Sequence, residues 1–183
     1  MTLPVTGSQT VGPFFRIGMA PLFRQEVAPA GTPGERVTVQ GRVLDGDGAG
    51  IPDATIEIWQ ADTRGRYADA GDKEGSFRGF GRVPTNEKGE FRFTTIRPGA
   101  VPAPDGSLQA PHLVVIVFMR GLLRHLLTRI YFADEAANES DAILKLVPAD
   151  RRHTLIAARN ESEAAFEWNV HMQGESETVF FEA

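Results

Sequence analysis

The chain has 183 residues, of which 42% are hydrophobic and 23% are charged, and its formal net charge is -5. This length and composition are typical of one folded domain with a sizeable core, and not of a disordered chain. No stretch is strongly basic, so nucleic acid is not an expected partner. The chain contains no cysteine, which excludes disulfides, thiolate zinc sites and a cysteine nucleophile.

Targeting and membrane signals are not recognisable in the sequence. The opening stretch "MTLPVTGSQTVGPFF" has no basic segment followed by an apolar core, so it does not read as a secretory signal. The longest apolar run, Leu113 to Met119, is much shorter than the roughly 20 residues that span a bilayer. We therefore expect a cytoplasmic protein without membrane contact.

Strand patterns dominate the chain. Residues 1–34 are rich in proline and glycine and only weakly periodic, which predicts an N-terminal arm lying outside a core formed by residues 35–183. Five segments then show strand patterns: 36–43, 54–61, 89–96, 112–119 and 165–173. Four of them alternate apolar with polar residues, whereas 112–119 is apolar throughout, which predicts burial on both faces.

Helix signals are scarce and confined to the last third of the chain. Residues 139–147 predict a short helix with Ser140 or Asp141 as its N-cap, and residues 148–160 predict a second with Asp150 as its cap. Turn residues separate the strand patterns at short spacing. The sequence therefore predicts an all-β fold, an antiparallel β-sandwich with an N-terminal arm and one or two short helices, forming a single domain over residues 1–183.

Imidazole and phenol groups are few, with four histidines and two tyrosines. The motifs of zincin metalloproteases, P-loop nucleotide-binding proteins and α/β-hydrolases do not occur. His171 alternates with apolar residues in a strand pattern and is expected to point to solvent or to an interface. His153 lies in a basic segment, so solvent exposure is expected for it. His125 precedes a strand pattern and is expected to be structural or at an interface. His112 stands where a loop becomes the apolar run 112–119.

Four motifs in order resemble the intradiol ring-cleavage dioxygenases. They are "EIWQADTRGRY", "FRGFGRVPTNEKGEFRFTTIRPG", "PHLVV" and "TRIYFADE", and they cover residue 37 to about residue 135. The opening "GSQTVGPFF" and closing "QGESETVFF" narrow the resemblance to an iron-free α chain of that family. The resemblance implies a β-sandwich. It also implies that catalytic members hold Fe(III) with two tyrosines and two histidines, which suit a hard ferric ion, and open a bound catecholate with O2.

Carried over residue by residue, the resemblance implies an incomplete iron site. Two of the four ligand positions keep a donor and two are aliphatic; in chain order they hold Tyr67, Val101, His112 and Val114. Gln109 replaces an arginine of the catalytic chains, and Tyr131 matches a structural aromatic. We therefore expect no metal site in this chain alone. Tyr67 and His112 are expected to hydrogen-bond to one another or to backbone, because buried polar groups need partners.

The resemblance further implies a partner. In the narrower branch, the iron-free chain pairs with a homologous iron-bearing β chain in a higher-order oligomer, and a small aromatic substrate binds near their shared surface. The positions that match the substrate-pocket lining are Thr10, Gly12 and Pro13. Arg120 matches an arginine that faces the partner's site, where a cation would favour the anionic substrate.

Alternatives remain at the level of residues and of function. The arm could serve only as an anchor whose Phe14 and Phe15 pack, and Arg120 could form an inter-subunit salt bridge. The whole chain could be a self-sufficient dioxygenase with an altered metal site, or a non-enzymatic β-sandwich binding module.

Overall fold

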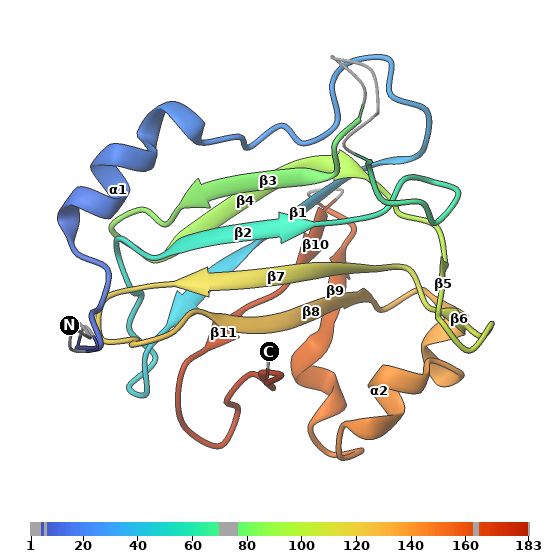
Figure 1. The fold of residues 1–183 in the computed structure, drawn as a ribbon. Coiled ribbons are helices and arrows are strands. Elements are labelled where there is room, and N and C mark those ends of the chain that lie inside the picture. Colours follow the sequence, from blue (N-terminus) through green and yellow to red (C-terminus); the bar gives the residue numbers. More distant parts are fainter. Residues whose placement is uncertain (1–4, 6, 70–76, 163–164, 183) are drawn as a thin grey trace.

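The computed structural model describes residues 5, 7–69, 77–162 and 165–182. Figure 1 shows a body of strands with short helices outside it. The strands are β1 (Arg36–Leu44), β2 (Thr55–Trp59), β3 (Phe80–Pro84), β4 (Glu90–Ile96), β5 (Val101–Pro102), β6 (Leu108–Gln109), β7 (His112–Phe118), β8 (Leu126–Phe132), β9 (Ile156–Asn160), β10 (Ala165–Glu167) and β11 (Val170–His171). The α-helices are α1 (Pro13–Met19) and α2 (Ala142–Leu146), and the 3-10 helices are η1 (Ala20–Leu22), η2 (Ala136–Glu139) and η3 (Arg152–Leu155).

Nine strands form one sheet that folds over a common core. Eight follow the order β11-β1-β10-β9-β8-β7-β2-β3, β4 pairs with β1, and β5 and β6 form a separate hairpin. The core combines side chains from both ends of this path, such as Val39 and Phe93 with Ile56 and Val115. The all-β sandwich prediction is confirmed. Most pairings are antiparallel, but β1 pairs with β10 and β11 in parallel, as does β8 with β9.

One face of strand β7 is fully buried, and the other is only partly covered. Leu113, Val115 and Val117 are fully buried, whereas Val114 and Ile116 between them are only partly covered. The prediction of burial on both faces is therefore wrong. An apolar run does not show how much of its second face the rest of the chain covers, since that depends on packing and not on local pattern.

The first of the two predicted helices is present, and the second is not. Helix α2 begins after Asp141, whose side chain accepts a 2.7 Å hydrogen bond from the Leu144 amide, so Asp141 is the N-cap. The helix predicted over residues 148–160 is wrong: η3 occupies its middle and β9 its end. Ile156 and Ala157 pair with β8, and this tertiary pairing outweighs the local helical pattern.

The N-terminal arm lies mostly outside the core, with two differences from expectation. It contains helix α1, which has no buried residue and begins at Pro13 after the N-cap Gly12. Val27 and Ala28 are fully buried, so the end of the arm does join the core. The strand predicted over residues 165–173 is likewise divided into β10 and β11, which both pair with β1.

In the part of the chain that the structure describes, no helix is long and apolar enough to cross a membrane.

Candidate functional site

The four positions that match iron ligands gather near the β5–β6 hairpin, and we call them the ligand-position cluster (Tyr67, Val101, His112 and Val114). His112 and Val114 are two residues apart on β7, so they share a face. Val101 begins β5. The loop that carries Tyr67 packs closely against the residue before β5. A Cβ added to Gly65 would lie only 1.8 Å from the Ala100 carbonyl oxygen. Gly65 also has a φ of 76°, so the turn requires glycine there.

His112 is buried, with 2% of its surface exposed. Its Nδ1 lies 2.7 Å from the Ala110 carbonyl oxygen, which can only accept, so Nδ1 carries the proton and donates. Burial lowers the pKa of His112 to about 4, and the positive charge of Arg129 acts in the same direction. The expected hydrogen bond from His112 to backbone is therefore confirmed.

Tyr67 lies at the rim of the cluster and is 37% exposed. Partial burial raises the pKa of its hydroxyl, and the charge of Arg129 opposes this rise. Among the described residues, Tyr67 and His112 do not hydrogen-bond to each other, so that alternative is wrong. The expectation that Tyr67 needs a buried partner fails because its ring reaches solvent.

Arg129 is the polar residue of this region that sequence reasoning missed. Its Nη1 donates to Gln109 Oε1 at 2.8 Å and to the Tyr131 hydroxyl at 3.3 Å. The Tyr131 hydroxyl donates to Asp141 Oδ1 at 3.1 Å, and the Ala110 amide donates to Asp141 Oδ2 at 2.7 Å. The only sign of Arg129 in the sequence is a charged residue inside a strand pattern. We call Gln109, Arg129, Tyr131 and Asp141 the Arg129 network.

Tyr131 is fully buried, in keeping with a structural aromatic. Burial raises the pKa of its hydroxyl to about 12, so the group stays protonated and donates to Asp141 at neutral pH. Tyr131 is thus engaged inside the network and is not a spare phenolate ligand.

The ligand-position cluster does not fit a ferric ion. Val101 and Val114 have no donor atom, and one phenol with one imidazole leaves most of the coordination sphere unfilled. Within residues 5, 7–69, 77–162 and 165–182, no group of three or more His, Cys, Asp or Glu side chains is placed to hold a metal. The cluster by itself therefore does not provide a complete iron centre.

A second candidate region joins the arm to the turn after β7. The Gly121 amide donates to Thr10 Oγ1 at 2.8 Å, and Thr10 Oγ1 lies 3.5 Å from the Met119 carbonyl oxygen. This arm–turn contact, between Thr10 and residues 119–121, brings the arm beside Arg120. Thr10, Gly12, Pro13 and Arg120 are all exposed. A Cβ on Gly12 would meet nothing within 4 Å, so packing inside this chain does not require a glycine at that position.

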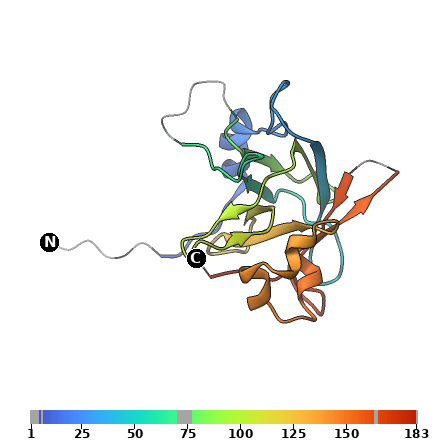
Figure 2. The same ribbon diagram turned by 90° about the vertical axis from the view of Figure 1, so that its right-hand side faces the viewer.

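The two regions lie at opposite ends of β7. His112 begins the strand and Phe118 ends it, and seven residues of strand span about 20 Å. Figure 1 shows β7 running from the β5–β6 hairpin toward α1, and the hairpin end faces the viewer in Figure 2. The structure therefore brings Arg120 close to Thr10 and the arm, but not to the ligand-position cluster of the same chain.

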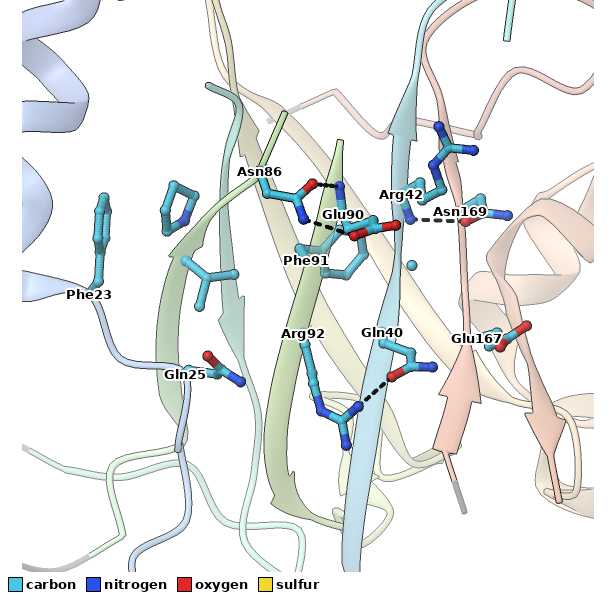
Figure 3. Close-up of a pocket in the computed structure, with 13 residues that line it drawn as sticks. Phe23, Gln25, Gln40, Arg42, Asn86, Glu90, Phe91, Arg92, Glu167 and Asn169 are labelled. Carbon is cyan, nitrogen blue, oxygen red and sulfur yellow. Dashed lines mark hydrogen bonds between the residues drawn. The ribbon is translucent and has the colours of Figure 1, made fainter. Parts of the chain in front are cut away.

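A separate hollow of about 870 Å³ lies over β1 and β4 (Figure 3). Its polar side chains are largely paired, with Arg92 Nη1 donating to Gln40 Oε1 at 2.8 Å and Asn86 Nδ2 donating to Glu90 Oε2 at 2.8 Å. None of the sequence-predicted site residues lines it. It carries charges of both signs, and its lining residues belong to neither candidate region.

The remaining histidines lie outside the ligand-position cluster. His153 is exposed, as expected, and His171 is half-buried. His125 is exposed, and its ring packs at 5.6 Å from the Phe118 ring, next to the arm–turn contact.

Comparisons with known proteins agree on one family. A family model described as "Dioxygenase" matches residues 12–175. The chain is 42% identical to the protocatechuate 3,4-dioxygenase alpha chain of Burkholderia cepacia, over 99% of this chain and 98% of that protein. It is 30% identical to the protocatechuate 3,4-dioxygenase beta chain of the same species, over 96% of this chain and 78% of that protein.

Solved structures show the same fold. The dioxygenase domain of a dioxygenase carbohydrate-binding protein fusion from Streptomyces sp. SirexAA-E superimposes with a TM-score of 0.62 at 26% identity, covering 81% of this chain and 85% of that one. The 3-chlorocatechol 1,2-dioxygenase of Rhodococcus opacus 1CP has a TM-score of 0.65 at 21% identity, covering 93% of this chain and 68% of that one. The chain belongs to the intradiol dioxygenase family that includes the alpha and beta chains of protocatechuate 3,4-dioxygenase.

Proposed function

We propose that this chain is the alpha subunit of a protocatechuate 3,4-dioxygenase. A homologous beta subunit holds Fe(III) and cleaves 3,4-dihydroxybenzoate with O2 to 3-carboxy-cis,cis-muconate, a step of aromatic compound catabolism in the beta-ketoadipate pathway. The observation that carries this proposal is the 42% identity to an alpha chain over 98% of its length. In the proposal, residues 1–183 act as one domain of an alpha/beta hetero-oligomer.

The geometry of the ligand-position cluster supports an iron-free role. His112 and Tyr67 keep donor atoms, but Val101 and Val114 cannot bind a metal. The family depends on Fe(III), so the metal must come from a second chain. The beta chain relative, 30% identical to this chain, provides a partner of the same fold family.

The arm–turn contact supports a role in the partner's pocket. Thr10 fixes the arm beside Arg120, and both lie about 20 Å along β7 from this chain's own ligand positions. Among the described residues, no carboxylate pairs with the Arg120 guanidinium, so its charge is available to a partner or a substrate. In this proposal Thr10, Gly12 and Pro13 line the substrate pocket at the subunit interface, and Arg120 favours the anionic substrate electrostatically.

Co-expression with a homologous beta chain tests the proposal. We expect the isolated chain to be colourless and inactive, and the complex to contain iron and to consume O2 with protocatechuate. A self-sufficient dioxygenase would instead bind stoichiometric iron alone and show a tyrosinate-to-iron absorption band. A binding module would form no complex with the beta chain. Either result would overturn the alpha-subunit assignment.

A further inference from the structure

We propose that the positive charge of Arg129 lies beside the former metal position in this chain and prevents the ligand-position cluster from binding iron. Reinstating the two missing ligand side chains then restores a metal site only when the positive charge of Arg129 is also removed. The inference rests on membership of the dioxygenase family and on contacts inside this chain, and it does not depend on which partner the chain binds.

The register of β7 and β8 places Arg129 against the first missing ligand. Val114 and Arg129 are directly opposite one another in the antiparallel pair, as are His112 and Tyr131. Directly opposite residues project to the same face, with Cβ atoms about 4.5–5.5 Å apart. The Arg129 side chain therefore begins beside the position where a ligand at residue 114 would point.

The β5–β6 hairpin places the guanidinium against the second missing ligand. Val101 pairs with Gln109 in that hairpin, and Gln109 Oε1 accepts the 2.8 Å hydrogen bond from Arg129 Nη1. Gln109 thus holds the guanidinium next to β5. One arginine lies close to both aliphatic positions, 101 and 114, which come from separate segments of the chain.

The charge of Arg129 is not neutralised by an ion pair. Within the described ranges no carboxylate lies within 4 Å of its guanidinium, and the acidic member of the network, Asp141, is reached only through the Tyr131 hydroxyl. The side chain is half-buried, so solvent screens its charge less than at a free surface. A ferric ion in the ligand-position cluster would meet this like charge.

The polar groups of the cluster are also satisfied without metal. His112 donates to the Ala110 carbonyl, and Asp141 accepts from the Ala110 amide and from Tyr131. Metal binding would have to displace Arg129 and break its hydrogen bonds to Gln109 and Tyr131, which adds to the electrostatic cost.

The test compares four versions of the full chain. The ligand-restored variant carries Val101→Tyr and Val114→His. A second variant adds Arg129→Gln, which removes the charge but keeps a hydrogen-bonding side chain, and a third adds Arg129→Lys, which keeps the charge. A fourth adds Arg159→Gln, which removes a positive charge from an exposed position of β9 that pairs with Phe166 of β10 and not with β7. Ferric iron per chain and the tyrosinate-to-iron absorption band are measured after reconstitution.

Only the variant with Arg129→Gln is expected to gain affinity for Fe(III). Arg129→Gln should raise Fe(III) affinity about 100-fold over the ligand-restored parent, whereas Arg129→Lys and Arg159→Gln should leave it low. Stoichiometric iron in the ligand-restored variant with Arg129 present would overturn the proposal. Equal gains with lysine and glutamine would also overturn it, because the effect would then be steric. A folded Arg129→Gln variant that takes up no iron would contradict it as well.

A simpler pair of variants covers the case in which the triple variants do not fold. Val114→His is compared with Val114→His combined with Arg129→Gln, with Co(II) as the probe and its visible absorption as the readout. Tighter Co(II) binding only in the second supports the proposal, and equal binding in both contradicts it. Neither measurement uses a beta chain, so failure here is distinct from failure of the alpha-subunit assignment.

Discussion

The Gly121 amide donates a 2.8 Å hydrogen bond to Thr10 Oγ1, joining residues 111 positions apart. This contact fixes the N-terminal arm on the turn between β7 and β8, directly beside Arg120. Two exposed segments that the sequence separates widely thus form one surface.

Replacing Thr10 with valine should release the arm. The substitution keeps the shape of the side chain but removes the acceptor for the Gly121 amide, at a cost of about 1 kcal/mol in arm placement. We expect the assembled enzyme to show a raised KM for protocatechuate with its iron content unchanged. Thr32→Val is the matched control, because the Thr32 hydroxyl bonds to the Pro29 carbonyl in a different turn of the arm. Equal KM values for both variants would remove the arm–turn contact from substrate binding.

Replacing Arg120 with alanine should reduce turnover more than it changes iron content. Loss of a charged hydrogen-bond donor near an anionic substrate typically costs about tenfold or more in kcat/KM. Steady-state O2 consumption by the assembled enzyme measures the effect, and size-exclusion chromatography checks assembly. Arg124→Ala removes an exposed arginine four residues away and should have little effect. Full activity of an intact Arg120→Ala complex would place Arg120 outside the pocket.

Replacing Asp141 with alanine should destabilise the fold. The buried carboxylate accepts hydrogen bonds from the amides of Leu144 and Ala110 and from the Tyr131 hydroxyl. The variant loses the helix cap and leaves two further donors, the Ala110 amide and the Tyr131 hydroxyl, without this acceptor. Together these losses should lower the free energy of unfolding by about 3 kcal/mol. Urea unfolding measures the change. Asp150→Ala, at an exposed aspartate, should change it little, and a comparable loss there would argue against a special role for Asp141.

Acid should destabilise the fold through His112. Its folded pKa of about 4 lies below the ordinary value of 6.5, so the unfolded chain binds the proton first as pH falls. The stabilisation is therefore fully present above pH 6.5 and is lost as pH falls toward 4. The difference amounts to about 3 kcal/mol.

The variant His112→Gln isolates this contribution from that of the carboxylates. We expect its free energy of unfolding to depend less steeply on pH between 6.5 and 4 than that of the parent chain. Thermal unfolding in matched buffers measures both slopes. Parallel slopes for the two proteins would show that protonation of His112 does not control acid stability.

Local pattern predicted the parts of the fold that depend on local chemistry. Alternation over 36–43 and 89–96 corresponds to β1 and β4, and Asp141 caps α2 as expected from its acceptor side chain. The helix predicted over 148–160 is wrong, because pairing of Ile156 with Tyr131 draws that segment into a strand. Sequence spacing also does not predict which face of β7 lies open, since other segments cover it.

The candidate site divides in the same way. Residue identity alone establishes that Val101 and Val114 cannot bind a metal, because their side chains have no donor atom whatever surrounds them. The position of Arg129 beside both follows only from the folded chain, because the register of β7 with β8 and the pairing of Val101 with Gln109 bring separate segments together. Residue type limits which chemistry is possible, and the packing of distant strands determines which charge occupies the space where that chemistry would take place.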